Sequence, residues 1–213
     1  MATGRDANRL GRVSEGAEGV DGSIRTHVAD LTKPSELTTL ASHSKRVDVL
    51  VHAAGVISMG TVDELSIDEF DRQYEVNLKA PFQLTQALLP SLQTAQGQVI
   101  FINSTAGLTA GAGAGPYAAT KHGLKAIADS LREEVNDRGI RVTSVFIGRT
   151  ATGMQAAIHK TEGKDYNPQL LLQPEDVAQI IIGILQLPRT AEVTEIRIRP
   201  MVKPGRIRDS GGL

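Results

Sequence analysis

The chain has 213 residues and a net charge of −1 at pH 7, and 40% of its residues are hydrophobic. This composition allows one large domain and shows none of the strong positive charge that marks nucleic-acid or membrane-surface binding. Cysteine is absent, which excludes disulfides and cysteine-based metal sites and fits a cytoplasmic protein without requiring one.

Short apolar runs bounded by turn residues predict the strands of the domain. The runs cover residues 24–32, 47–55, 97–107, 140–148 and 193–200. They lack strict alternation of apolar and polar residues, which is typical of strands buried on both faces of a parallel sheet. No apolar run is long enough to cross a membrane.

Helical patterns lie between these runs. The segment 66–92 predicts two helices that meet near Pro81, with Ser66 as the cap of the first. Apolar stripes also predict helices over 115–135 and 174–187. Strands alternating with helices indicate an α/β domain with a doubly wound parallel sheet, here residues 1–200. Residues 201–213 are expected to form a loose tail or a subunit contact.

Ligands of doubly wound folds bind at the carboxyl ends of the strands, and small and polar residues gather at those ends here. The first group follows the 47–51 run, the second follows the 97–102 run and the third follows the 140–146 run. The groups are His52-Ala53-Ala54-Gly55, then Asn103 and Ser104, then Ile147, Gly148, Thr150 and Thr152.

A tyrosine and a lysine, Tyr117 and Lys121, stand one helical turn apart just after the Ser104 loop. A phenol is a poor proton donor near pH 7 because its ordinary pKa is about 10. A neighbouring ammonium would stabilise the phenolate and ease proton transfer. The pair is therefore a candidate acid/base unit.

These pieces together resemble the short-chain dehydrogenase/reductase family, over residues 2–200 approximately. Tyr117-x-x-x-Lys121 matches the family signature, and Ser104 stands thirteen residues before Tyr117, as the family expects. Asn77 in "YEVNLKAPF" matches the family's helix asparagine. "HAAG" stands in place of Asn-Asn-Ala-Gly, and "IGRTAT" in place of Pro-Gly-x-x-x-Thr.

The resemblance implies a Rossmann-like fold and reversible hydride transfer between a nicotinamide cofactor and a carbonyl or alcohol substrate. Tyr117 would be the general acid or base, and Ser104 would hydrogen-bond the substrate oxygen. Lys121 would lower the pKa of Tyr117 and hold the nicotinamide ribose. Asn77 would bind a water that links Lys121 to solvent.

The resemblance also implies a set of cofactor-binding residues. They are Arg5, Asp30, Leu31, Ala53, Ala54, Gly55, Tyr117, Lys121, Ile147, Gly148, Thr150 and Thr152. Arg5 would pair with a 2′-phosphate, so NADP(H) is favoured over NAD(H). Two simpler interpretations stay open: Arg5 as a plain surface charge and Asp30 as a turn former.

One departure from the family pattern concerns the phosphate-binding turn. The family opens with a strand and a Thr-Gly-x-x-x-Gly-x-Gly turn, whereas "ATGRDANRLG" resembles the end of the family's second strand. This register leaves about 30 residues, one β-α unit, unaccounted for. Three explanations are open: the sequence omits preceding residues, the start codon is misassigned, or the chain is a remnant. A non-catalytic binding or assembly module is therefore the alternative function.

The expected partners are a small carbonyl or alcohol substrate and a second copy of the chain. The helices at 81–92 and 117–135 resemble those that the family packs between subunits, which predicts a homodimer or homotetramer. Their small residues are Ala87, Ala118, Ala119, Ala126 and Ala128. The histidines show no metal-ligand spacing, so we expect no metal site.

Overall fold

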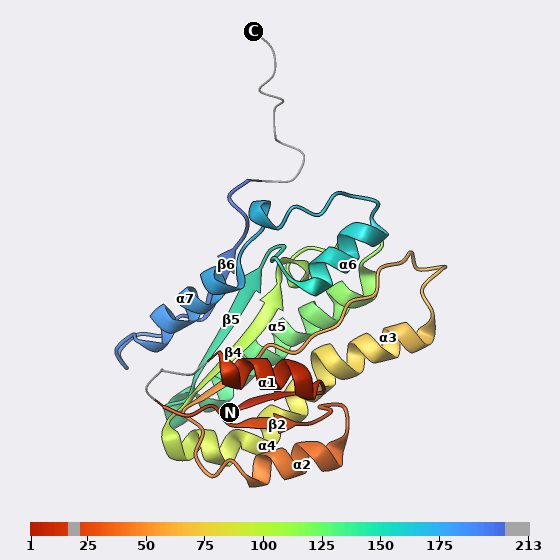
Figure 1. Ribbon diagram of the computed structural model, residues 1–213. Helices are drawn as coiled ribbons and strands as arrows, with labels where there is room; N and C mark the ends of the chain where they lie inside the picture. Colours follow the sequence, from red (N-terminus) through yellow and green to blue (C-terminus); the bar gives the residue numbers. More distant parts are fainter. Residues whose placement is uncertain (17–21, 203–213) are drawn as a thin grey trace.

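The computed structural model describes residues 1–16 and 22–202 and shows parallel strands flanked by helices (Figure 1). One sheet pairs β1 (Ala2–Gly4) with β2 (Thr26–Val28). The other has the order β3 (Val49–His52), β4 (Gln98–Ser104), β5 (Arg141–Ile147) and β6 (Glu195–Ile198). The α/β class and the parallel pairing expected from the sequence are confirmed. Residues 203–213 of the predicted tail lie outside the described residues.

Seven α-helices lie in residues 1–16 and 22–202. They are α1 (Ala7–Glu15), α2 (Pro34–Ser42), α3 (Ile67–Tyr74), α4 (Ala80–Ala95), α5 (Gly115–Val135), α6 (Gly153–Thr161) and α7 (Pro174–Leu185). Short helical turns add η1 (Glu75–Lys79), η2 (Thr105–Gly107), η3 (Asn136–Arg138) and η4 (Pro168–Leu170). None of the described helices is both long and apolar enough to cross a membrane.

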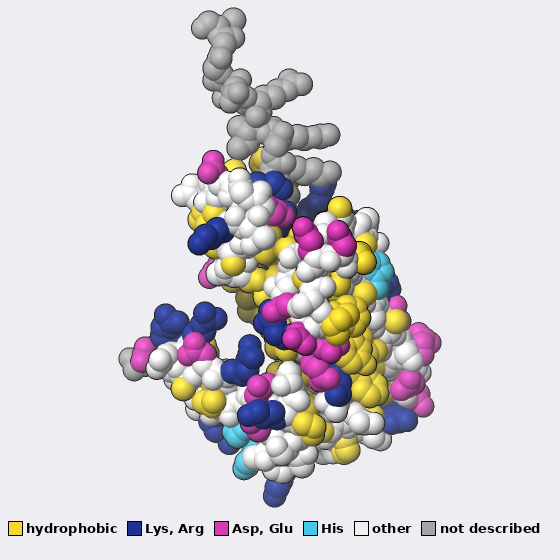
Figure 2. All heavy atoms as spheres, turned by 90° about the vertical axis from the view of Figure 1, so that its right-hand side faces the viewer, with side chains coloured by type: hydrophobic (Ala, Val, Ile, Leu, Met, Phe, Trp, Pro, Cys, Tyr) yellow, Lys and Arg dark blue, Asp and Glu magenta, His cyan; other side chains and the backbone are white. Residues whose placement is uncertain are grey.

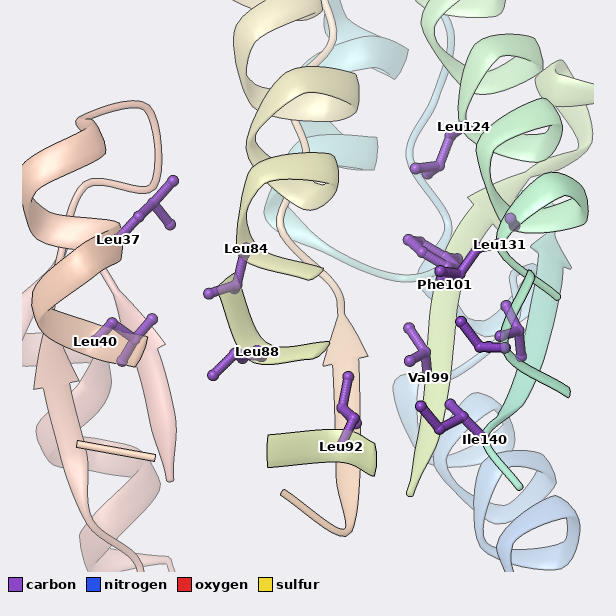
Figure 3. Packing of buried hydrophobic residues seen from close by; sticks show 13 residues of the cluster. Leu37, Leu40, Leu84, Leu88, Leu92, Val99, Phe101, Leu124, Leu131 and Ile140 are labelled. Carbon is purple, nitrogen blue, oxygen red and sulfur yellow. The ribbon is translucent and has the colours of Figure 1, made fainter. Parts of the chain in front are cut away.

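Helices cover both faces of the larger sheet, and alternation along β4 divides the core into two clusters. Val99 and Phe101 pack with leucines of α2, α4 and α5, as Figure 3 shows. Ile100 points to the opposite face and packs with Val145 and with Ile184 of α7. Because β4 is buried on both faces, its sequence reads as a continuous apolar run.

The two sheets do not join. Among the described residues, β1 pairs with β2 and β3 pairs with β4, and no strand connects β1 to β3. A cavity of about 1110 Å³ lies at this break, lined by residues of both sheets and of α4.

The predicted helix junction near Pro81 lies at the start of α4, which begins at Ala80. The irregularity is the π-helical turn η1, whose last residue is Lys79, and Pro81 instead lies in the first turn of α4. The N–H of Ala80 bonds the carbonyl of Glu75, five residues back. Proline has no N–H and fits the first turn of a helix, so the disturbance falls on the turn before it.

Candidate active site

The predicted catalytic serine and tyrosine lie at the same end of the larger sheet. Ser104 is the last residue of β4 and pairs in register with Ile147 of β5. Tyr117 lies in the first turn of α5, where Pro116 occupies an early position that needs no backbone donor. The hydroxyl of Ser104 accepts the N–H of Ala106 at 3.1 Å and also faces the phenol of Tyr117. Ser104 therefore both caps the η2 turn and contacts the tyrosine.

Lys121 is a buried lysine one turn along α5 from Tyr117. Its side chain is 4% exposed, and its Nζ donates to the carbonyl of Ile102 at 3.2 Å and lies 5.9 Å from the centre of the Tyr117 ring. Burial lowers the pKa of Lys121 from 10.5 to about 8 because a desolvated ammonium is disfavoured. The charged form thus still predominates at pH 7.

Tyr117 does not behave as the sequence suggested. Burial raises the pKa of its phenol above the ordinary value of 10, and the contact with Ser104 only partly offsets this rise. Lys121 does not contribute to the shift, since its ammonium lies against the backbone carbonyl of Ile102. Desolvation is the larger cause of this shift, and the lowering of the tyrosine pKa by Lys121 stays a prediction.

Asn103, one of the polar residues expected at the strand ends, and Gly107, which the sequence did not single out, hold β4 against α5. Asn103 is 1% exposed; its Nδ2 donates to the carbonyl of Lys121 at 3.1 Å and its Oδ1 accepts the N–H of Ser104 at 2.8 Å. Gly107 lies so close that a Cβ there would stand 2.7 Å from the carbonyl oxygen of Lys121. An amide and a glycine next to Ser104 were the available signal for this contact.

Asn77 is fully buried in the π-helical turn η1. Its Oδ1 accepts the N–H of Val56 at 2.8 Å, and its Nδ2 donates to the carbonyl of Val56 at 2.9 Å and to Thr120 at 3.2 Å. The side chain is thus occupied by the segment that follows β3. The water that the resemblance implies at Asn77 stays a prediction.

The loop after β5 is fixed by its own hydrogen bonds and by one ion pair. The hydroxyl of Thr150 donates to the carbonyl of Gly148 at 3.1 Å, and Thr152 caps α6. Arg149 pairs with both carboxylate oxygens of Glu162, at 2.9 and 2.6 Å, and this contact lowers the pKa of Glu162 to about 2. A Cβ at Gly148 would stand only 3.0 Å from Pro200, so close packing favours glycine there.

The segment after β3 presents small residues at the same rim. Ala53 and Ala54 are exposed and Gly55 is half-buried. His52 turns inward, stacks on Phe101 at 4.9 Å between ring centres and lies 2.8 Å from the hydroxyl of Thr85. Burial lowers the pKa of His52 to about 3, so this histidine is neutral and structural.

Arg5 and Asp30 come together at the carboxyl ends of β1 and β2. Arg5 is exposed, and its positive charge contributes to a lowered pKa of Asp30. The larger cause is Thr32, whose N–H and hydroxyl both donate to Asp30 Oδ1, at 3.0 and 2.8 Å. Asp30 therefore forms a turn, as its simpler interpretation held, beside an exposed arginine. Leu31 lines the cavity between the sheets.

The residues at this rim fit the nicotinamide and adenosine ends of a dinucleotide better than the pyrophosphate between them. Tyr117, Lys121 and the 147–152 loop form one group at the ends of β4 and β5, and Arg5 with Asp30 forms another at the ends of β1 and β2. In the described chain, β1 leads through Arg5 and Asp6 directly into α1, without a glycine-rich turn. This fold and this rim define an α/β protein of the dinucleotide-binding class.

Comparisons with known proteins agree. Residues 1–163 match the family model described as short chain dehydrogenase. An uncharacterized oxidoreductase from Staphylococcus saprophyticus is 29% identical over 207 residues, covering 94% of this chain and 86% of that protein. A metagenomic short-chain oxidoreductase solved in complex with NADP has a TM-score of 0.77 at 26% identity, covering 94% of this chain and 85% of that one.

A further structure supports the fold alone. The alcohol dehydrogenase of the archaeon Thermococcus sibiricus, solved with 5-hydroxy-NADP, has a TM-score of 0.84 at 22% identity and covers 93% of this chain and 84% of that one. The chain belongs to the short-chain dehydrogenase family. It is thus an enzyme of the NAD(P)-dependent oxidoreductase class, as the sequence predicted.

Proposed function

We propose that the protein interconverts a carbonyl and an alcohol with NADP(H), using Tyr117 as the acid/base. The observation that carries this proposal is the contact of Ser104 with Tyr117 beside the buried ammonium of Lys121. Ser104 ends β4, and Tyr117 and Lys121 lie on α5 of the same strand-turn-helix unit. Asn103 and Gly107 hold that unit together.

When bound, the nicotinamide supplies or accepts the hydride. The hydroxyl of Ser104 donates to the substrate oxygen and holds it at the phenol. Tyr117 then gives its proton to that oxygen in reduction, or receives one in oxidation. Burial raises the pKa of the phenol above its ordinary value. Lys121 keeps positive charge beside the ring and contacts the ribose.

The cofactor preference rests on Arg5. It is exposed at the end of β1, next to Asp30, and a guanidinium can pair with a 2′-phosphate by a charge-assisted hydrogen bond. Asp30 and Leu31 would border the adenine, and Ala53, Ala54 and Gly55 let the cofactor approach the backbone. Ile147, Gly148, Thr150 and Thr152 would line the nicotinamide. NADP(H) is therefore preferred over NAD(H).

The proposed assembly is a homodimer or homotetramer in the cytoplasm, with no nucleic-acid partner. Ala87, Ala119 and Ala126 are exposed on α4 and α5 and can contact a second subunit. Ala118 and Ala128 are 1% and 0% exposed, so they belong to the core of this chain and are removed from the expected interface. Hydrophobic side chains gather on the face drawn in Figure 2, and Phe70, Tyr74 and Phe82 are exposed on α3 and α4.

Replacement of Tyr117 tests the chemistry. Tyr117→Phe should lower kcat for NADPH-dependent reduction of a panel of aldehydes and ketones by at least about a hundredfold, the low end for general acid catalysis. Tyr74→Phe is the matched control, because Tyr74 is 44% exposed on α3 and lies outside the proposed site. Near-normal turnover in Tyr117→Phe contradicts the assignment. In the same assay, equal kcat/KM with NADPH and NADH contradicts the role of Arg5.

A non-catalytic binding module is the second candidate, favoured by the direct passage from β1 into α1. A turnover assay at millimolar NADPH separates the two: a module that keeps only the fold does not reduce the aldehydes and ketones of the panel, whereas an oxidoreductase does.

A further inference from the structure

We propose that Thr120 is a positioning residue that fixes Tyr117 against Asn77 and so sets where the phenol stands in the site. Thr120 lies on α5, between Tyr117 and Lys121, and is 3% exposed. The inference rests on the proposed function of Tyr117 as the acid/base. It adds to the site a residue that acts through the tyrosine and not on the substrate or the cofactor.

The first turn of α5, which carries Tyr117, is a weakly held part of the helix. The N–H groups at the start of a helix have no partner within the helix and are usually bonded by a capping side chain. The cap position here is Ala114, which has no polar side-chain atom to form that bond. Gly113 and Gly115 stand on either side of it, and glycine restricts the backbone least. A contact from elsewhere in the fold therefore has to hold the turn.

The hydroxyl of Thr120 supplies such a contact, because it is bonded on both sides. It donates to the carbonyl of Tyr117 at 2.8 Å and accepts from Nδ2 of Asn77 at 3.2 Å. The orientation of the Asn77 amide is determined by Val56, whose N–H faces Oδ1 and whose carbonyl faces Nδ2. Since Nδ2 can only donate, the single proton of Thr120 goes to the carbonyl of Tyr117.

The two bonds connect Tyr117 to the segment that follows β3. Asn77 lies in η1, and α5 packs against η1 and α3 (Figure 1). The connection runs from the backbone of Val56 through two buried side chains to the backbone of Tyr117. Asn77 and Thr120 are 0% and 3% exposed, so bulk water does not compete for these bonds. Val56 directly follows Gly55, which is proposed to border the cofactor, so Thr120 relates the acid/base to that part of the site.

Removal of the hydroxyl should therefore misplace the phenol. A displacement of about 1 Å at a reacting group can lower a rate about a hundredfold. Thr120→Val keeps the shape of the side chain and removes the hydroxyl, so kcat should fall at least about tenfold. The value of kcat/KM should fall by the same factor, because a proton donor acts in the transition state. Thr120→Ser can form the same bonds and should restore kcat to within about twofold.

A fluorine spectrum reads the position of Tyr117 without turnover. The chain contains three tyrosines, so 3-fluorotyrosine in the 213-residue chain gives three resonances, and Tyr117→Phe identifies one of them. Thr120→Val should shift or broaden this resonance, and Thr120→Ser should restore it. Thr120→Ala, which places no methyl group beside the Asn77 amide, should act as Thr120→Val does. Unchanged resonances of Tyr74 and Tyr166 show that each variant is folded.

Thr143→Val is the matched control. Thr143 is 1% exposed on β5, and its hydroxyl donates to the carbonyl of Val193 at 2.7 Å, so the same group is lost from a similarly buried bond outside the site. This variant should be less stable in urea but should keep the wild-type kcat and the wild-type Tyr117 resonance.

Three results would overturn the proposal: a wild-type resonance and kcat in Thr120→Val, an equal loss in Thr143→Val, or no rescue by Thr120→Ser. If the wild-type chain reduces no carbonyl of the panel at millimolar NADPH, the proposed function fails. The fluorine spectrum alone then still decides whether Thr120 fixes Tyr117.

Discussion

Replacing Lys121 by methionine should make the protein more stable at pH 7. Lys121 is 4% exposed, and its pKa falls from 10.5 to about 8 on burial. Each pKa unit corresponds to 1.36 kcal/mol, so the buried ammonium destabilises the folded state by about 3 kcal/mol when it is charged. Methionine is equally unbranched and carries no charge. Loss of the hydrogen bond to Ile102 offsets about 1 kcal/mol, which leaves a net gain of about 2 kcal/mol.

The stability gained by Lys121→Met should decrease as the pH rises. The folded-state pKa of Lys121 is lowered, so between about pH 8 and 10.5 the unfolded chain holds more protons and wild-type stability rises with pH. The destabilisation is fully present below about pH 8 and disappears as the pH approaches 10.5. Above that pH, Lys121→Met should be about 1 kcal/mol less stable than wild type, through the lost hydrogen bond.

Urea unfolding of both proteins at several pH values between 7 and 10.5 measures the difference directly, and effects of other groups cancel in the comparison. The control is Lys125→Met, one turn further along α5. Lys125 pairs with Asp129 at 2.7 Å and with Glu195, and these partners raise its pKa. Its replacement should destabilise the protein at pH 7. A stability difference for Lys121→Met that is zero, negative at pH 7 or independent of pH would refute the reasoning.

Two further predictions concern the loop after β5 and the assembly. Glu162→Gln should lower stability at pH 7 by about 1–3 kcal/mol, because Arg149 holds the pKa of Glu162 near 2. This contribution is present above about pH 4.5 and is lost as the pH falls through 2, so the unfolding free energies of variant and wild type should converge in acid. A difference between the two free energies that stays constant with pH contradicts the prediction. Light scattering at micromolar concentration should give the mass of a dimer or tetramer, and a monomer mass contradicts the interface proposed on α4 and α5.

The sequence predicted the parts of the site that depend on chain order and spacing. Ser104, Tyr117 and Lys121 belong to one strand-turn-helix unit, so their spacing along the chain determines their spacing in space. Val99 to Ile102 form a buried strand because apolar residues on both of its faces have helices to pack against.

The sequence could not predict features that depend on contacts between distant segments. The pKa of Tyr117 follows from burial, which local sequence does not encode. The side chain of Asn77 bonds to Val56 and Thr120, which lie 21 and 43 residues away. The same holds for Asn103 and Gly107, whose partner is the backbone of Lys121. Packing outweighs propensity at each of these positions.

The pyrophosphate position leads to the last prediction, weak NADPH binding by the 213-residue chain. A helix N-terminus normally attracts phosphate through free N–H groups and the helix dipole. The N-terminus of α1, which follows the counterpart of the family's second strand, does not take over this role, because the carboxylate of Asp6 there accepts the N–H of Arg9 at 3.0 Å and would repel an anion. Hydrogen bonds to charged oxygens contribute about 1.5–3 kcal/mol each, so the lack of two or three reduces affinity about a thousandfold, from micromolar to millimolar.

Titration calorimetry of residues 1–213 with NADPH checks this expectation, and 2′-phosphoadenosine serves as the control ligand. The control lacks the pyrophosphate but keeps the 2′-phosphate that Arg5 would bind, so its affinity should be similar to that of NADPH. A micromolar Kd for NADPH with a much weaker Kd for the control contradicts the account, because pyrophosphate would then be bound by residues other than a glycine-rich turn. Similar weak binding of both ligands places the binding energy at Arg5 and Asp30, as the geometry at the ends of β1 and β2 requires.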